Sequence, residues 1–247
     1  MAIPPGILYR LAKPFLDRRG MEVLPKDRHE KKGTTPSALQ RARGRGICPG
    51  TVIDVGASDG RWSVATSRVF PEARFHMLEP LLERKESLEA LCAKTPAFRY
   101  RLAAASDRCG SAHLAVSEDL DGSALSADGQ TGARLIDVTT IDFEVAKNDL
   151  LAPYLIKLDT HGFEAEILRG ALETLPQTEM LIIEAYNFNL GGEALRFPQL
   201  CLHLESLGFR CADLVDLSWR PSDGMLWQMD LVFIPSASPS FSCNAYA

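Results

Sequence analysis

The sequence has no two cysteines in a C-x-x-C spacing, although six cysteines are spread over its 247 residues. Structural zinc sites and dithiol redox centres commonly draw on such pairs, so neither kind of centre is predicted. We expect reduced thiols, as is usual in a cytoplasmic protein. The six are Cys48, Cys92, Cys109, Cys201, Cys211 and Cys243.

Long apolar runs are also missing. No stretch approaches the roughly 20 consecutive apolar residues that a membrane-spanning helix needs. The N-terminus has no continuous apolar region followed by a small-residue cleavage site, as a secretory signal would have. We therefore expect a cytoplasmic protein without a transmembrane segment. Its 46% hydrophobic content is enough for the core of one large domain.

Positive charge is scarce outside the N-terminal region. Residues 1–50 contain eleven Lys and Arg against four Asp and Glu, which leaves 16 against 28 for the rest of the chain. A predominantly acidic body argues against nucleic acid as a partner. The composition leaves a homo-oligomer open.

The two ends of the chain differ from its middle. Residues 1–45 are interpreted as a basic extension, with a short helix where apolar residues recur at helical spacing between Ile7 and Phe15. The polar segment 24–46 contains Gly and Pro and is predicted to be a loop or linker. Residues 46–236 are expected to form the main domain and residues 237–247 a disordered tail.

From residue 51 onward, short apolar runs alternate with longer amphipathic stretches. This alternation is typical of a mostly parallel sheet with helices on both faces. Strands are predicted at 51–55, 73–78, 98–104, 154–159, 179–185, 209–215 and 226–234. Helices are predicted at 61–70, 80–94, 163–175 and 193–207.

Two intervals depart from this alternation. Residues 107–150 hold two short β-leaning runs separated by turn residues, which predicts a small hairpin inserted before the next core strand. Residues 216–225 are too few for a helical crossover between the last two strands. Those strands should therefore be antiparallel neighbours.

The stretch TVIDVGASDGRWS, residues 51–63, allows two chemically different interpretations. As a G-x-S-x-G elbow it would make Ser58 the nucleophile of a serine hydrolase. As a strand followed by a turn from Gly56 to Gly60 it would bind a cofactor. No strand is predicted before residue 51, and the only histidine after residue 161 is His203, within an apolar helix pattern. The cofactor interpretation is therefore favoured.

The end of the second strand supports a nucleoside cofactor. Glu79 follows Asp54 by 25 residues, about the separation expected for a carboxylate that accepts hydrogen bonds from ribose hydroxyls. The turn lacks the middle glycine of the dinucleotide-binding G-x-G-x-x-G loop, so a cofactor without phosphate fits better. S-Adenosyl-L-methionine has no phosphate, and Asp54 would face its ammonium group directly or through water.

Two stretches resemble the FkbM-type family of S-adenosylmethionine-dependent methyltransferases. VIDVGASDGRWS is similar to the family's opening turn, and IKLDTHGFEAEILRGA, residues 156–171, is similar to its I-K-x-D-x-x-G-x-E-x-x-x-L-x-G-A signature. The resemblance extends over residues 50–235. It implies an α/β class I methyltransferase with a Rossmann-like, seven-stranded, mostly parallel sheet whose last strand is antiparallel. It also implies O-methylation of a hydroxyl on a sugar, glycan or secondary metabolite.

Cofactor contacts are predicted in the turn after the first strand, at the end of the second strand and after the third. These residues are Asp54, Gly56, Ala57, Ser58, Gly60, Ser63, Glu79, Ser106 and Asp107. A non-catalytic nucleoside-binding protein on the same sheet stays open as an alternative, beside the serine hydrolase.

Catalysis is assigned to the end of the fourth strand, where a base would face the transferred methyl group. His161 or Asp159 is predicted to be that general base, since imidazole titrates near physiological pH. The acceptor pocket is predicted to contain Glu184, Tyr186, Asn187, Trp219 and Arg220. Glu184 and Asp159 would also offer oxygen ligands to Mg²⁺, although two carboxylates supply only part of its octahedral coordination.

Overall fold

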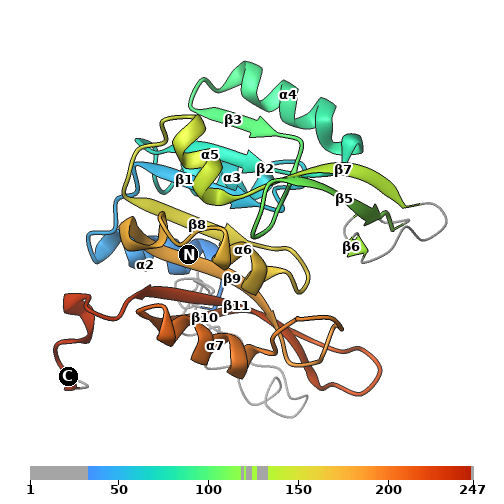
Figure 1. The fold of residues 1–247 in the computed structure, drawn as a ribbon. Helices are drawn as coiled ribbons and strands as arrows, with labels where there is room; N and C mark the ends of the chain where they lie inside the picture. The colour runs from blue at the N-terminus through green and yellow to red at the C-terminus, as the bar shows by residue number, and fades with distance from the viewer. Residues whose placement is uncertain (1–32, 118–119, 121–123, 127–132, 246–247) are drawn as a thin grey trace, which may run out of the picture. The chain divides into compact units, whose positions relative to one another are not determined.

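The computed structural model describes residues 33–117, 120, 124–126 and 133–245, so the helix expected between Ile7 and Phe15 lies outside the described residues. Its centre is a seven-stranded sheet in the order β10-β11-β9-β8-β1-β2-β3 (Figure 1). These strands are β1 (Thr51–Val55), β2 (Arg74–Leu78), β3 (Phe98–Arg101), β8 (Tyr154–Leu158), β9 (Thr178–Tyr186), β10 (Phe209–Trp219) and β11 (Leu226–Pro235).

The pairing of the strands confirms the class I methyltransferase sheet. Strands β3, β2, β1, β8 and β9 are parallel neighbours, whereas β11 pairs antiparallel with both β9 and β10. The antiparallel pairing predicted from the short connection 216–225 is thus confirmed, with Leu214 opposite Leu231.

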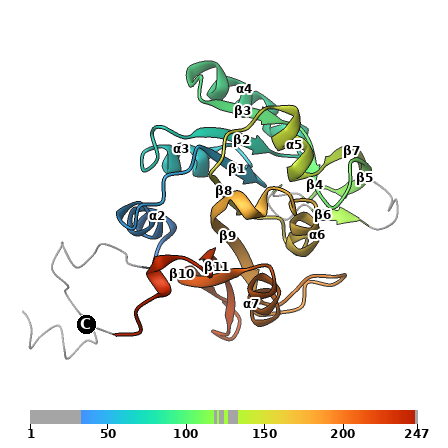
Figure 2. The same ribbon diagram turned by 60° about the vertical axis from the view of Figure 1, so that its left-hand side comes forward.

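Helices cover both faces of this sheet (Figures 1 and 2). The six α-helices are α2 (Thr35–Gly44), α3 (Arg61–Ser67), α4 (Lys85–Lys94), α5 (Ile141–Lys147), α6 (Glu164–Arg169) and α7 (Phe197–Ser206) in the described part of the chain. Successive residues of a strand point to opposite faces. Ile53 accordingly packs in the core with α5, α6 and α7, and Val52 in the core with α2, α3 and α4. None of the described helices has the length and apolar character needed to span a membrane.

Helix α2 shows that the linker prediction for residues 24–46 is wrong over its second half. Ala38, Leu39 and Ala42 are spaced for one helical face. They are buried in the core that contains Val52 and lies between the sheet and α2, α3 and α4, called the second core below. The proline that favoured a loop occupies the first turn, where a helix tolerates it. Asp216 fixes the N-terminal end, because its Oδ2 accepts hydrogen bonds from the N–H and the hydroxyl of Thr35 at 2.8 and 2.6 Å.

The C-terminal segment also departs from the expected disorder. Residues Pro239–Phe241 form the 3-10 helix η3. The Phe241 ring contacts the second core, and the guanidinium carbon of Arg210 lies 4.4 Å from its centroid.

The insertion between residues 107 and 150 contains the predicted hairpin. Strands β5 (Gly110–Ala115) and β7 (Arg134–Thr139) pair antiparallel, and with β4 (Ala104–Ala105) and β6 (Ala124–Ser126) they form a second sheet in the order β4-β7-β5-β6. Helix α5 follows β7 and was not predicted. Its cap is the signal that was overlooked: the Thr140 side chain accepts a hydrogen bond from the N–H of Phe143 at 3.0 Å.

Glu144 joins α5 to both sheets through a buried network. Its carboxylate accepts hydrogen bonds from Thr139 at 2.7 Å and from Arg101, and it lies 2.9 Å from Nε2 of His76. Burial alone would raise the pKa of Glu144, but the hydrogen bonds from His76, Thr139 and Arg101 lower it to about 2. The ionised carboxylate therefore stabilises the folded state.

We expect Glu144→Gln to lower the free energy of unfolding by about 3 kcal/mol at neutral pH, since a pKa of about 2 lies roughly two units below the usual 4.3 and each unit is worth about 1.4 kcal/mol. Because the folded-state pKa is depressed, this stabilisation is fully present above about pH 4.3 and lost as the pH falls toward 2. Urea unfolding at neutral and acidic pH should therefore show a smaller pH dependence for Glu144→Gln. The matched control is Glu86→Gln at an exposed position of α4. Equal stabilities at both pH values for the two variants would contradict the assignment.

Candidate active site

A cavity of about 500 Å³ lies at the carboxyl ends of β1, β2, β8 and β9. Ligands of open parallel sheets bind at this edge, and the volume is typical of small-molecule sites. The second sheet supplies an apolar wall, since Leu114 of β5 and Ala104 of β4 line the cavity together with Leu81. The wall joins residues from three separate segments of the chain.

The turn after β1 adopts backbone conformations that favour glycine. Gly56, Ser58 and Gly60 have φ values of 74°, 49° and 80°. A Cβ atom on Gly56 would lie 2.0 Å from the carbonyl oxygen of Asp159, and one on Gly60 would lie 2.5 Å from Cδ2 of Leu91. Gly56 therefore lets β1 end against β8, and Gly60 lets α3 begin beside α4. Of the two glycines, only Gly56 lines the cavity.

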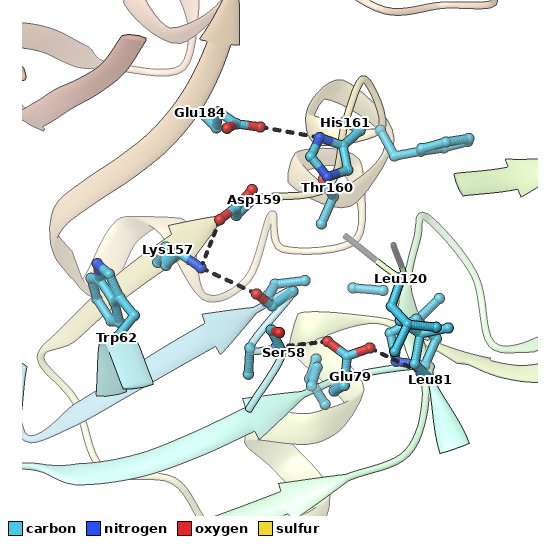
Figure 3. Close-up of a pocket in the computed structure, with 18 of the residues that line it drawn as sticks. Ser58, Trp62, Glu79, Leu81, Leu120, Lys157, Asp159, Thr160, His161 and Glu184 are labelled. Atoms are coloured by element: carbon cyan, nitrogen blue, oxygen red, sulfur yellow. Dashed lines mark hydrogen bonds and ion pairs between the residues drawn. The ribbon is translucent and has the colours of Figure 1, made fainter. Parts of the chain in front are cut away.

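Glu79 ties the end of β2 to this turn (Figure 3). Its side chain accepts hydrogen bonds from the N–H groups of Ser58 at 2.7 Å and Leu81 at 2.9 Å, and the residue is only 4% exposed. Burial raises the pKa of its carboxyl. Each carboxylate oxygen has a second lone pair, so Glu79 keeps acceptor capacity for a ligand in the cavity that it lines.

Lys157 lies at the base of the cavity and was not predicted. Its Nζ is 3.2 Å from Oδ1 of Asp54, 3.1 Å from the carbonyl oxygen of Gly56 and 3.1 Å from Oδ2 of Asp159. Burial alone would lower the pKa of Lys157, but the charges of Asp54 and Asp159 raise it. The ammonium group therefore stays charged and joins β1, the turn and the end of β8.

Asp54 consequently has a different environment from the one predicted. Ser63 donates a hydrogen bond to its Oδ2 at 2.6 Å, and Lys157 contacts its Oδ1. Asp54 is fully buried and, like Ser63, does not line the cavity. Asp54 therefore stabilises the turn through Ser63 and Lys157 and not through a surface of the cavity.

We expect Lys157→Met to cost about 3–5 kcal/mol of unfolding free energy, because it leaves the buried carboxylate of Asp54 without a counter-charge. Denaturant unfolding measures this cost. The control is Lys94→Met at an exposed position near the end of α4, which should change stability by less than about 0.5 kcal/mol. A Lys157→Met protein as stable as the Lys94→Met protein would show that the ion pairs are not needed.

His161 is held on one side of the cavity by two residues of β9. Its Nδ1 lies 2.7 Å from the hydroxyl oxygen of Tyr186 and 3.2 Å from Oε2 of Glu184. The Tyr186 hydroxyl donates to Glu184, whose Oε1 accepts a hydrogen bond of 2.8 Å from Gln228. The carboxylate of Glu184 thus organises both neighbours. All four residues line the cavity.

Glu164 fixes the turn that carries His161. Its Oε1 accepts hydrogen bonds from the N–H of Gly162 at 3.0 Å and the hydroxyl of Thr160 at 3.1 Å. His161 itself has a φ of 54°, a left-handed conformation that is uncommon for a residue with a Cβ atom. Backbone strain of this kind is concentrated at functional sites.

Asp159 and His161, the two predicted bases, differ in their surroundings. Burial alone would raise the pKa of Asp159, but the ammonium of Lys157 lowers it. A carboxylate with a depressed pKa is a weak proton acceptor. The surroundings therefore favour His161 over Asp159 as the base.

Several predicted site residues do not line the cavity. Ser106 and Asp107 follow β4, and the Ser106 hydroxyl lies 3.2 Å from Oε2 of Glu166. The acceptor residues outside the cavity are Asn187, Trp219 and Arg220. Arg220 pairs with Asp223 in the connection between β10 and β11.

The structure adds lining residues that sequence reasoning missed, among them Trp62, Leu114, Leu120, Lys157 and Gln228. Lys157 had a signal, because it is a charged residue within the otherwise apolar strand YLIKL. Gln228 and Leu114 carry no local signal, because they reach the cavity only through strand pairing.

The hydrolase interpretation finds no support. Within residues 33–117, 120, 124–126 and 133–245, no hydrogen bond links the Ser58 side chain to a histidine. His203, the late histidine that a triad would require, belongs to α7 and does not line the cavity.

One group of side chains has the composition of a cation site. Ligand atoms of Asp159, His161 and Glu184 all lie within 4.8 Å of one another. Two carboxylates and an imidazole suit a divalent cation. Each of the three, however, already contacts a protein partner: Lys157, Tyr186 or Gln228.

Known proteins that are similar to this chain include two methyltransferases. No curated protein matches the chain. Among solved structures, a methyltransferase FkbM from Methylobacillus flagellatus KT is similar with a TM-score of 0.48 and 20% identity, over 74% of this chain and 43% of that protein. The 1,6-didemethyltoxoflavin-N1-methyltransferase of Burkholderia thailandensis, solved with S-adenosylhomocysteine, is similar with a TM-score of 0.45 and 13% identity, over 96% and 92% of the two chains.

The family comparison is more specific. The model of the methyltransferase FkbM domain matches residues 54–211, which include the turn after β1, Glu79 and the turn with His161. The chain therefore belongs to the FkbM methyltransferase family and carries the domain of an S-adenosylmethionine-dependent methyltransferase.

Proposed function

We propose that this chain transfers the methyl group of S-adenosyl-L-methionine to a hydroxyl of a small molecule or glycan. The observation that carries the proposal is the meeting of three features in one cavity: the glycine-containing turn after β1, the buried Glu79 and the strained His161. The first two suit a nucleoside cofactor, and the third suits removal of a proton.

The cavity offers a partner for each part of the cofactor. Glu79 has acceptor capacity for ribose hydroxyls, and Ala104, Leu114 and Leu120 form an apolar surface for the adenine ring. The ionised Asp159 also lines the cavity, and its negative charge would favour the sulfonium and ammonium groups. We assign the site no phosphate contacts, in keeping with a cofactor that carries none.

The proposed reaction is a displacement at the methyl carbon. The acceptor oxygen forms a bond to carbon as the carbon–sulfur bond breaks, which leaves S-adenosylhomocysteine as a neutral thioether. The hydroxyl proton passes to Nε2 of His161. A positioned base of this kind contributes about 100- to 10,000-fold, and alignment of acceptor and methyl group contributes further.

The proposal is tested with S-adenosylmethionine that carries a ¹³C-labelled methyl group and a panel of sugars, glycans and hydroxylated metabolites. One labelled methyl ether per product, identified by mass and by its carbon chemical shift, is the expected result. Transfer to nitrogen or carbon would overturn the assignment of the acceptor. Cofactor binding without transfer to any acceptor would instead favour a non-catalytic nucleoside-binding protein.

A divalent cation such as Mg²⁺ is a second candidate for activation of the hydroxyl. It is favoured by the spacing of Asp159, His161 and Glu184, whose ligand atoms lie within 4.8 Å of one another. Lys157 opposes it, because its ammonium already lies 3.1 Å from Asp159. Turnover that survives EDTA unchanged would support the imidazole base, whereas loss of turnover that Mg²⁺ restores would support the cation.

A further inference from the structure

Tyr186 and Glu184 lie beside Nδ1 of His161, and their own hydrogen bonds determine whether this nitrogen carries a proton. The Tyr186 hydroxyl has a single hydrogen, and it donates this hydrogen to Oε2 of Glu184. Burial and the charge of Glu184 raise the pKa of Tyr186, so the phenol keeps that hydrogen. The Tyr186 oxygen, 2.7 Å from Nδ1 of His161, can therefore act toward Nδ1 only as an acceptor.

The second neighbour of Nδ1 is also an acceptor. Oε2 of Glu184 lies 3.2 Å from Nδ1, and its partner oxygen Oε1 already accepts a hydrogen bond from Gln228 at 2.8 Å. Since both oxygens near Nδ1 offer lone pairs, a stable contact requires a hydrogen on Nδ1 itself.

We infer that Tyr186 and Glu184 are positioning residues that hold His161 in its Nδ1–H tautomer. In a neutral imidazole this tautomer places the basic lone pair on Nε2. Figure 3 shows one nitrogen of the His161 ring joined to Glu184 by a dashed line and the other nitrogen on the opposite side of the ring. The inference rests on the proposed function only in giving this lone pair a use: it accepts the hydroxyl proton.

The surroundings limit the rotation of His161. Tyr186 is 7% exposed and Glu184 is 9% exposed, and hydrogen bonds from Tyr186 and from Gln228 to Glu184 hold the two side chains in place. Gly162 follows His161, and a Cβ atom there would lie 2.8 Å from Cβ of Ala194, so the turn is packed on its outer side. A ring flip would place a carbon atom against two acceptor oxygens and lose the contacts of Nδ1 with Tyr186 and Glu184.

The tautomer is measured by long-range ¹H–¹⁵N correlation spectra of protein labelled with ¹⁵N-histidine, without cofactor or acceptor. The His161 signals are identified by their disappearance in His161→Asn. At about pH 8.5, where histidine is ordinarily neutral, we expect a protonated Nδ1 and an unprotonated Nε2. A protonated Nε2, or an even mixture of the two tautomers, would overturn the inference.

Glu184→Gln tests the positioning role separately from folding. We expect the His161 signals to shift toward a mixture of tautomers and kcat to fall at least about 10-fold, with little change in the KM for S-adenosylmethionine. The matched control, Glu193→Gln, alters an exposed carboxylate and should leave both unchanged. An unchanged tautomer in Glu184→Gln would assign Glu184 a merely structural role.

Failure of the tautomer inference and failure of the proposed function give different results. An Nδ1–H tautomer in a protein that transfers no methyl group would contradict the proposed function and leave the inference standing. Methyl transfer by a protein whose Nε2 carries the proton would do the reverse. A cation bound through Nδ1 would also remove the Nδ1 hydrogen, so a second spectrum recorded with added Mg²⁺ discriminates between the imidazole base and the Mg²⁺ alternative.

Discussion

His161→Asn is expected to lower kcat for methyl transfer by about 100- to 10,000-fold, because it removes the group that accepts the hydroxyl proton. Asparagine is the appropriate replacement, since it tolerates the left-handed backbone conformation that His161 adopts with its φ of 54°. The affinity for S-adenosylhomocysteine should change by less than about threefold, since the loss falls on the chemical step.

Single-turnover rates and cofactor titrations measure the two effects separately. The control is His113→Asn, which alters an exposed histidine of β5 and should retain the wild-type rate. A His161→Asn enzyme with near-normal turnover would rule out His161 as the base. A variant that loses cofactor affinity and turnover together would instead assign His161 to binding.

Gly56→Ala is expected to cost more than about 4 kcal/mol of unfolding free energy, in the range reserved for severe steric conflicts. The added Cβ atom would lie 2.0 Å from the carbonyl oxygen of Asp159, and neither backbone can move without separating β1 from β8. The left-handed conformation adds strain of about 1–2 kcal/mol for a residue with a Cβ atom. The folded fraction should also bind the cofactor poorly, because the turn faces the cavity.

Gly208→Ala separates the conflict from the strain. Gly208 has a similar φ of 87°, but a Cβ atom there would have nothing within 4 Å. The unfolding free energy of this variant should therefore fall only by the cost of the backbone strain, about 1–2 kcal/mol. Urea unfolding compares the two, and equal losses would show that the contact between Gly56 and Asp159 relaxes easily.

Much of the fold could be predicted because the sequence pattern is local. The alternation of buried strands with amphipathic helices is visible in single segments, and the short connection between β10 and β11, residues 220–225, forces an antiparallel pair. Helix α2 was missed for a physical reason. Its Pro and its flanking glycines favour a loop when taken alone, whereas its stability comes from burying Leu39 against the sheet.

The candidate site was less predictable, because its contacts join distant segments. Asp54 was expected to face the cofactor, yet it lies in register with Lys157 of β8 and pairs with it. Glu184 was assigned to the acceptor, and the structure places it against His161, 23 positions earlier in the chain. The order of the strands in the sheet determines which of these side chains come into contact, and the pattern of a single sequence does not contain that order.

Calorimetric titration with S-adenosylhomocysteine tests most directly whether the cavity binds the cofactor. The expected result is one saturable site per chain, from which S-adenosyl-L-methionine displaces the ligand. Glu79→Gln should weaken binding at least about tenfold, since a hydrogen bond to a charged group is worth about 1.5–3 kcal/mol. Glu86→Gln, on the exposed side of α4, should bind normally. The absence of saturable binding to the wild-type protein, or equal affinities in the two variants, would contradict the placement of the cofactor beside Glu79.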